Sequence, residues 1–250
     1  MAFLPELGFG ALRGRMWGME TISTLRQAVL WPRDLSPVVP AACSDGDDVV
    51  VFIHGFFASA GAFRPMRARI ERETGAHVAS FTHAPGQSVR TIARKLARVV
   101  DRIPPTSRVH LVGHSLGGIV ARWYVQEMGG HARVTQTISM ASPFGGAPLA
   151  GRLPFFVGRD LHGDSATLAR LRTSPHADRV PHTSIIAGED HLVVPQGSGA
   201  FHHGEVFVLA GRSHNSLLFD REVVRIVATQ VAAHRKVTQL APRAPLARTG

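Results

Sequence analysis

Short apolar runs that alternate with segments of helical periodicity constrain the fold of this chain most strongly. A continuous run of β-branched and aromatic residues over 49–53 is typical of a strand buried on both faces. Strands that alternate with helices of ten or more residues form a mostly parallel sheet with helices on both faces. The sequence therefore predicts an α/β fold, with strands at 49–53, 76–81, 108–112, 134–140, 183–187 and 205–209 and helices at 62–73, 89–100, 116–128 and 217–233.

The composition fits one globular domain with short extensions. Of the 250 residues, 44% are hydrophobic and 18% are charged, which excludes a chain that is disordered throughout. No apolar run approaches the roughly 18–20 residues that a membrane-spanning helix needs. Cys43 is the single cysteine, so we expect neither an intramolecular disulfide nor a cysteine-based zinc site.

The net charge of +10 comes almost entirely from arginine, since only two of the 28 basic residues are lysines. Such a charge is compatible with nucleic acid, an anionic membrane or an acidic partner. Many of the arginines recur at helical spacing between apolar residues, which is typical of solvated helix faces. We therefore expect no nucleic-acid partner, and we expect solvent exposure for Arg67, Arg69, Arg72, Arg90, Arg94, Arg98 and Arg102.

We divide the chain into an amino-terminal extension over 1–45, a main domain over 46–238 and a flexible tail over 239–250. In the extension the arginines follow the apolar residues, the reverse of a secretory signal, so we expect a cytoplasmic or peripherally membrane-associated protein. The apolar residues either pack on the domain, which we favour, or lie in a membrane interface. The residues behind these expectations are Phe3, Phe9, Met16 and Trp17, with Arg13 and Arg15, and a linker marked by Pro32, Pro37 and Pro40.

One junction between a strand and a helix carries chemistry. Residues 113–117 read Gly-His-Ser-Leu-Gly and stand between the predicted strand at 108–112 and the predicted helix that begins near Leu116. A Gly-x-Ser-x-Gly turn in this position holds its serine in a strained backbone conformation above the sheet. Chance alone would supply the pentapeptide in roughly one chain of this composition in six, so the strand-to-helix context is what favours Ser115 as a nucleophile.

A nucleophilic serine needs a histidine base, which in turn needs an orienting acid, and in this architecture the acid precedes the histidine in the chain. His214 follows the last predicted strand and precedes the last predicted helix. For the acid we favour Asp190, in the turn after the strand at 183–187, with its neighbour Glu189 as the rival. Asp160 and Asp164 lie too early in the chain for this role.

Two backbone N–H groups must then stabilise the oxyanion. We assign one to Leu116, directly after the nucleophile, and the other to Phe56, in the loop after the first strand. Gly55 lets that loop approach closely, and His54 and His114 support the site. The remaining loop histidines, His191, His202 and His203, lack a carboxylate or cysteine at ligand spacing, so we expect no metal site.

Three motifs together resemble the α/β-hydrolases of the bacterial lipase and esterase group, including triacylglycerol lipases and inositol-deacylase-like enzymes. They are Val-Phe-Ile-His-Gly-Phe at 51–56, Val-Gly-His-Ser-Leu-Gly-Gly-Ile-Val-Ala-Arg at 112–122 and Ala-Ser-Pro-Phe-Gly-Gly at 141–146. The resemblance covers about residues 48–235. It implies a serine ester hydrolase without metal or organic cofactor, with a cap or lid at about 143–179. The chain departs from the group in having Phe-Gly-Gly after Ser-Pro, and in lacking the cysteine pair and calcium loop of some secreted lipases.

The cap is rich in aliphatic and phenylalanine side chains, which suits an apolar substrate, although an ordinary helical cap packed on the sheet has the same composition. We therefore expect hydrolysis of apolar or lipid esters through an acyl-enzyme. An acyltransferase or a thioesterase would use the same residues. A non-catalytic, membrane-associated binding protein on a retained hydrolase fold is the alternative from another class. The cap residues in question are Leu149, Leu153, Phe155, Phe156, Val157, Leu161, Leu168 and Leu171.

Overall fold

Six parallel strands form one sheet in the computed structural model, which describes residues 7–40, 42–148 and 156–240. The strand order is β2-β1-β3-β4-β5-β6. Each predicted strand is present, with ends that shift by at most two residues. The strands are β1 (Asp48–Ile53), β2 (His77–Phe81), β3 (Arg108–His114), β4 (Val134–Met140), β5 (His182–Ala187) and β6 (Glu205–Leu209).

Strand β1 shows why the sequence of this sheet reads as continuous apolar runs. All six of its residues are buried. Val49, Val51 and Ile53 pack into the core on one face, whereas Val50 and Phe52 pack into the core on the other. Because successive side chains of a strand point to opposite faces, a strand covered on both sides must be apolar at every position.

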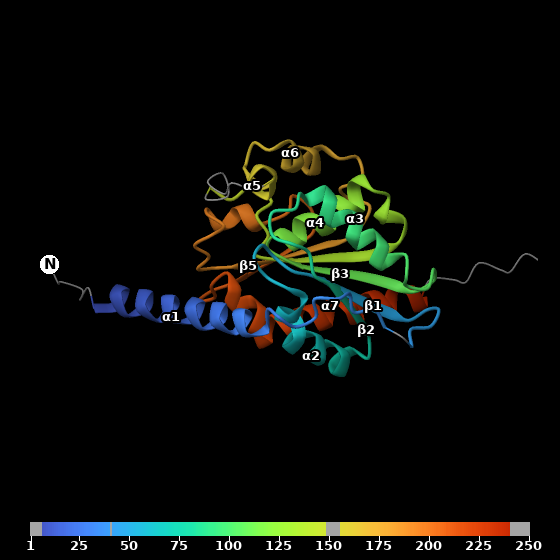
Figure 1. The fold of residues 1–250 in the computed structure, drawn as a ribbon, viewed down its shortest axis with the longest axis horizontal. Coiled ribbons are helices and arrows are strands. Elements are labelled where there is room, and N and C mark those ends of the chain that lie inside the picture. The colour runs from blue at the N-terminus through green and yellow to red at the C-terminus, as the bar shows by residue number, and fades with distance from the viewer. Residues whose placement is uncertain (1–6, 41, 149–155, 241–250) are drawn as a thin grey trace, which may run out of the picture.

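Helices cover both faces of the sheet, as Figure 1 shows. One face carries α3 (Val89–Val100), α4 (Leu116–Glu127), α5 (Phe156–Leu161) and α6 (Ala166–Thr173), and the other carries α2 (Arg64–Thr74) and α7 (Arg221–Leu240). Short 3-10 turns are η1 (Ala60–Phe63), η2 (Gly130–Ala132), η4 (Gln196–Gly199) and η5 (Asn215–Phe219). The α/β-hydrolase architecture expected from the sequence is therefore confirmed.

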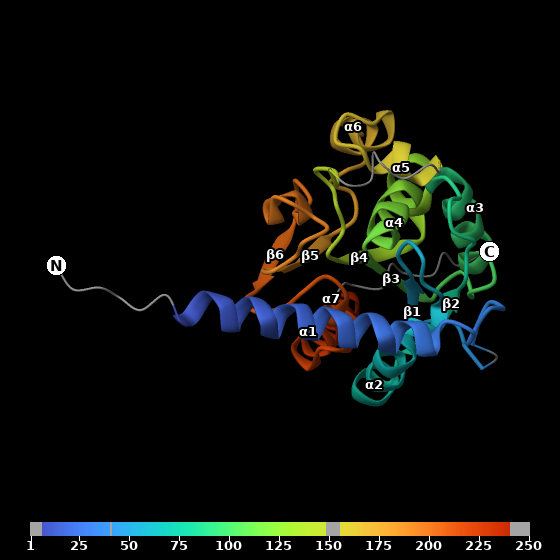
Figure 2. The same ribbon diagram turned by 60° about the vertical axis from the view of Figure 1, so that its left-hand side comes forward.

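Much of the amino-terminal extension forms a single long helix, α1 (Leu7–Leu30). It runs across the molecule beside η5 and η1, on the side of the sheet that carries α2 and α7 (Figure 2). Phe3 lies outside the described residues. No helix within the described residues is long and apolar enough to cross a membrane.

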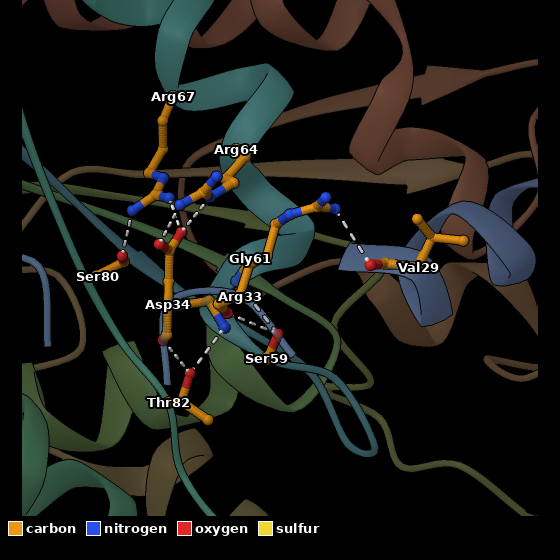
Figure 3. Close-up of polar contacts among 10 residues, drawn as sticks. Val29, Arg33, Asp34, Ser59, Gly61, Arg64, Arg67, Ser80 and Thr82 are labelled. Carbon is orange, nitrogen blue, oxygen red and sulfur yellow. Dashed lines mark hydrogen bonds and ion pairs between the residues drawn. The ribbon is translucent and has the colours of Figure 1, made fainter. Parts of the chain in front are cut away.

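The segment after α1, which the prolines mark as a linker, is anchored to the domain. The Asp34 carboxylate accepts hydrogen bonds from Arg64 at 2.9 and 3.0 Å and forms an ion pair with Arg67 (Figure 3). The hydroxyl of Thr82 donates to the Asp34 carbonyl at 2.7 Å. The hydrogen bond from Arg64 and the charges of both arginines hold the pKa of Asp34 below its ordinary value, against the opposing effect of burial. Figure 3 thus shows a polar cluster that fixes the end of α1 to α2 and β2.

This cluster corrects one expectation from the charge pattern. Arg67 was expected on a solvated face, but it is only 7% exposed and donates to the Ser80 hydroxyl at 2.6 Å. The physical reason is Asp34, which supplies the buried guanidinium with a counter-charge from a segment 33 residues away in sequence. No pattern within α2 carries that information.

The cap packs on the helices that cover the sheet. Leu161, Leu168 and Leu171 are buried in the same core as α3 and α4. The Asp160 carboxylate accepts the first N–H of α3, from Val89, at 2.8 Å. Residues 149–155, with Leu149, Leu153 and Phe155, lie outside the described residues, and the side chains of Phe156 and Val157 are not described either.

Candidate active site

Ser115 stands in a strained turn between β3 and α4. Its backbone has φ 54° and ψ −120°, in a region that residues with a side chain rarely adopt. The two flanking glycines make the turn feasible, because a Cβ on Gly117 would lie 2.0 Å from the Ile53 carbonyl oxygen. A Cβ on Gly113 would lie 2.3 Å from the carbonyl carbon of Gly117. This is the nucleophile elbow that the strand-to-helix context predicts.

Asp190 and His214 are brought together at the ends of β5 and β6. His214 Nδ1–H donates to Asp190 Oδ2 at 2.8 Å, and the two side chains are 6% and 2% exposed. This hydrogen bond fixes the imidazole with its proton on Nδ1 and leaves Nε2 free to accept a proton. His214 and Ser115 line the same cavity.

The Asp190 carboxylate is held in place by more than the histidine. Its Oδ1 accepts the backbone N–H groups of Leu192 at 2.8 Å and Val193 at 2.9 Å. Burial alone would raise the pKa of Asp190, but the hydrogen bond and charge of His214 and the two backbone donors outweigh it, so the pKa lies below its ordinary value. Asp190 is therefore ionised at neutral pH and able to support an imidazolium.

The other carboxylates considered as partners of His214 lie elsewhere. The backbone N–H of Glu189 bonds to the carbonyl of Arg212 at 2.9 Å, and no contact of its carboxylate with His214 occurs within the described residues. Asp160 caps α3, as described above, and Asp164 is exposed on the cap. Geometry thus separates Asp190 from its neighbour, which sequence alone left open.

The loop after β1, which the sequence assigns to the oxyanion and which we call the oxyanion loop, lies against Ser115. A Cβ on Gly55 would lie 3.1 Å from the Cβ of Ser115, and Phe56 lines the same cavity as the serine. Leu116 is the first residue of α4, where the backbone N–H has no partner within the helix. His54 Nδ1–H donates to the Gly55 carbonyl at 2.8 Å, while its Nε2 accepts the His83 backbone N–H at 3.0 Å. These two hydrogen bonds of His54 join the loop after β1 to the segment after β2.

His114 ties the nucleophile elbow to the base. Its Nε2–H donates to the main-chain carbonyl of His214 at 3.0 Å. Burial and the neighbouring His214 lower the pKa of His114 to about 3, so the ring is neutral at physiological pH. Its Nδ1 is buried, has no hydrogen-bond partner within the described residues, and lies 3.2 Å from where a Gly55 Cβ would be. The sequence pattern gave no sign of this link to the base loop.

The cavity above Ser115 has a volume of about 490 Å³, and one of its walls comes from the amino-terminal extension. Three residues of α1 and the following Trp31 line it together with the loop after β1. None of the described lining residues comes from the cap at 143–179. The pattern of residues 1–45 does not indicate this wall. The cavity is lined by Thr24, Gln27, Ala28, Trp31, Gly55, Phe56, Phe57, His114, Ser115, Leu192, His214 and Asn215.

The candidate metal ligands of the described residues gather elsewhere. Cys43, Asp47 and His77 place one ligand atom each within 4.8 Å of one another. They lie at the amino-terminal ends of β1 and β2, whereas Ser115 follows the carboxyl end of the parallel strand β3. The cluster therefore stands at the opposite edge of the sheet from the candidate active site. The loop histidines His191, His202 and His203 belong to no such cluster.

A six-stranded parallel sheet with a nucleophile elbow and an Asp–His pair at its carboxyl edge defines an α/β-hydrolase. The sequence profile of the palmitoyl protein thioesterase family matches residues 49–174. The chain belongs to the palmitoyl protein thioesterase family and is thus an enzyme that hydrolyses ester bonds. The match includes Ser115 and ends before Asp190 and His214. The resemblance to the α/β-hydrolases drawn from the three motifs is confirmed.

Solved structures agree with this fold. The mature lipase BlEst2 of Bacillus licheniformis has a TM-score of 0.66 and 13% identity, covering 78% of this chain and 97% of its own. An esterase of Pyrobaculum calidifontis has a TM-score of 0.60 and 16% identity, covering 96% of each chain. A metagenomic carboxyl esterase has a TM-score of 0.59 and 17% identity, covering 81% of this chain and 79% of its own. The comparison with curated proteins finds no significant match.

Proposed function

We propose that this chain hydrolyses carboxylic esters of apolar acyl groups through an acyl-enzyme. Ser115 attacks the carbonyl carbon, while His214 takes the hydroxyl proton and returns it to the leaving alcohol. Asp190 keeps the imidazole tautomer and stabilises the imidazolium. The backbone N–H groups of Phe56 and Leu116 stabilise the oxyanion. The single observation that carries the proposal is the 2.8 Å contact between His214 and Asp190 beside the cavity of Ser115.

A thioester is the second candidate substrate, and the family match favours it. The same residues serve a thioester, because the carbonyl carbon is attacked identically and only the leaving atom changes from oxygen to sulfur. Transfer of the acyl group to an alcohol differs only in the acceptor. Hydrolysis of an octanoyl ester and the matching octanoyl thioester by one preparation, with and without added alcohol, separates these three activities.

The cavity favours an apolar acyl group. Trp31, Phe57 and Leu192 line it and remain 42%, 59% and 43% exposed, so apolar surface surrounds the opening. Burying one methylene group is worth about 0.8 kcal/mol, which is roughly fourfold in kcat/KM. An acyl chain that covers these side chains would gain that amount per carbon until the cavity is filled.

We predict that kcat/KM on p-nitrophenyl esters increases from acetate to octanoate. The increase should be several-fold per added carbon at first and should level off at longer chains. Trp31→Ala should make kcat/KM depend less on acyl length, because the substitution removes one apolar wall of the cavity. Val206→Ala, at an exposed position of β6, is the matched control. A steady fall in kcat/KM from acetate to octanoate would contradict the preference for longer acyl groups.

We further propose that the apolar side of α1 next to α2 and η5 attaches the protein to an anionic membrane surface. Ile22, Leu25 and Val29 are 53%, 61% and 67% exposed on this side. They line a second cavity of about 500 Å³ between α1, α2 and η5, and Arg26 and Arg69 also line it. Exposed apolar side chains next to cations are typical of helices that lie in a membrane interface. The net charge of +10 adds attraction to anionic lipid.

Vesicle binding tests this attachment. We predict that phosphatidylglycerol vesicles bind the protein more strongly than phosphatidylcholine vesicles, and that binding weakens as salt is raised. The triple variant Ile22→Ser, Leu25→Ser and Val29→Ser should lose most of the binding. A control variant, Val206→Ser with Val208→Ser, removes exposed apolar surface from β6 instead. Equal sedimentation of the triple variant and the wild type would rule out α1 as the attachment surface.

A further inference from the structure

Glu20 of α1 reaches the residue that directly follows the catalytic histidine. Its Oε2 accepts the backbone N–H of Asn215 at 3.1 Å, and its Oε1 accepts the Asn215 side-chain Nδ2–H at 2.6 Å. The same Nδ2 donates to the Thr24 hydroxyl at 3.3 Å. These contacts join parts of the chain that are 195 residues apart, and α1 lies outside the region matched by the family.

The peptide group between His214 and Asn215 is held on both of its sides. Its carbonyl oxygen accepts from His114 Nε2–H at 3.0 Å, and its N–H donates to Glu20 at 3.1 Å. Asp190 holds the imidazole ring of the same residue at 2.8 Å. Three elements that are distant in sequence therefore fix the main chain and the ring of His214, and Glu20 is the member supplied by α1.

We propose that Glu20 is a positioning residue of the active site, which fixes the main chain of His214 so that the imidazole faces Ser115. The proposal rests on the hydrolysis proposed above, because it assigns Glu20 a role in that reaction. Glu20 does not line the catalytic cavity, so it acts through His214 and not on the substrate. Catalysis by a base depends on its placement to within about 1 Å, and a misplacement of that size lowers the rate about 100-fold.

The pairing of Glu20 with Asn215 allows a test by exchange. In Glu20→Gln, only one of the two side-chain atoms that face Asn215 is still an acceptor. The other is an NH₂ group, which faces one of the two N–H donors of Asn215, so one of the two hydrogen bonds is lost. In Asn215→Asp, two carboxylates face each other. The double variant Glu20→Gln with Asn215→Asp restores both hydrogen bonds: the new amide oxygen accepts the backbone N–H, and its NH₂ group donates to the new carboxylate. Only the polarity of the side-chain bond is reversed.

The experiment measures kcat and KM on p-nitrophenyl octanoate for the wild type, both single variants and the double variant. All chains are full length, and the number of active sites is counted by the stoichiometry of phosphonate labelling. Glu73→Gln, at the exposed end of α2, is the matched control. We expect each single variant to lose tenfold or more in kcat per labelled site with KM within about twofold, and the double variant to recover to within about threefold.

Three results would overturn the role of Glu20. In the first, the single variants keep both their kcat and their thermal stability. In the second, the double variant is as slow as the single variants. In the third, the single variants lose thermal stability while kcat per labelled site is unchanged. The last result would make Glu20 a purely structural contact of α1. Failure of the proposed hydrolysis itself has a different signature, since the wild type would then neither hydrolyse the ester nor react with the phosphonate.

Discussion

Replacement of Asp190 by asparagine should lower kcat for ester hydrolysis by about 10⁴-fold and leave the melting temperature nearly unchanged. An asparagine fits the same space, but its amide neither fixes the Nδ1–H tautomer of His214 nor stabilises the imidazolium. Asp190 accepts from His214 at 2.8 Å and from Leu192 and Val193 at 2.8 and 2.9 Å, so the substitution acts at the centre of this network. Steady-state kinetics on p-nitrophenyl octanoate, together with a thermal melt, measures both quantities.

Glu189→Gln is the matched control for this substitution. Glu189 is adjacent to Asp190 in sequence, and its replacement by glutamine removes the same charge. The Glu189 carboxylate, however, makes no contact with His214 within the described residues. It should keep kcat within about threefold of the wild type. A large loss in Glu189→Gln with little loss in Asp190→Asn would transfer the role of the acid to Glu189.

Arg122→Met should lower the free energy of unfolding by about 2–6 kcal/mol, because two buried carbonyls lose their donor. Arg122 is fully buried in α4 and donates to the carbonyls of Ala177 at 2.5 Å and Val180 at 3.1 Å and to the Thr137 hydroxyl at 3.1 Å. Burial lowers the pKa of Arg122 to about 10, which leaves it charged at neutral pH. Methionine fills part of the space but leaves the carbonyls of Ala177 and Val180 without a donor, at about 1–3 kcal/mol for each buried group, whereas the Thr137 hydroxyl keeps its contact with His182.

Urea unfolding followed by circular dichroism measures this loss. Arg98→Met on the exposed side of α3 is the control and should change the free energy of unfolding by less than about 0.5 kcal/mol. Arg122 lies in α4, the helix that follows Ser115, and it anchors the chain segment 177–180. A loss of less than about 1 kcal/mol in Arg122→Met would show that the segment does not depend on the guanidinium.

The sheet and the strained turn at Ser115 were predictable because both are recorded in local patterns. The helix at Val89–Val100 and the strands Val134–Met140 and Glu205–Leu209 have the predicted bounds. Each is a run of one periodicity that ends at a proline, a glycine or a polar turn. The turn at Ser115 was predictable for the same reason, since its glycines and its strand-to-helix context lie within a dozen residues.

Contacts between distant segments were not predictable in this way. The arginines of α2 share one helical pattern, yet Arg67 is buried because Asp34 of another segment pairs with it. Residues 1–45 read as an extension, since nothing within them specifies that Glu20 meets Asn215 or that Trp31 borders the cavity of Ser115. Such contacts depend on how the whole chain packs, which a single sequence does not record.

The most direct test of the account is the reaction of the intact protein with an active-site phosphonate, followed by mass spectrometry of the peptides. Only a serine activated by a base attacks phosphorus at a useful rate. We expect one label per chain on Ser115, no label in Ser115→Ala, and much slower labelling in Asp190→Asn. Undiminished labelling in Ser115→Ala, or no labelling of a wild-type preparation that hydrolyses esters, would contradict the account.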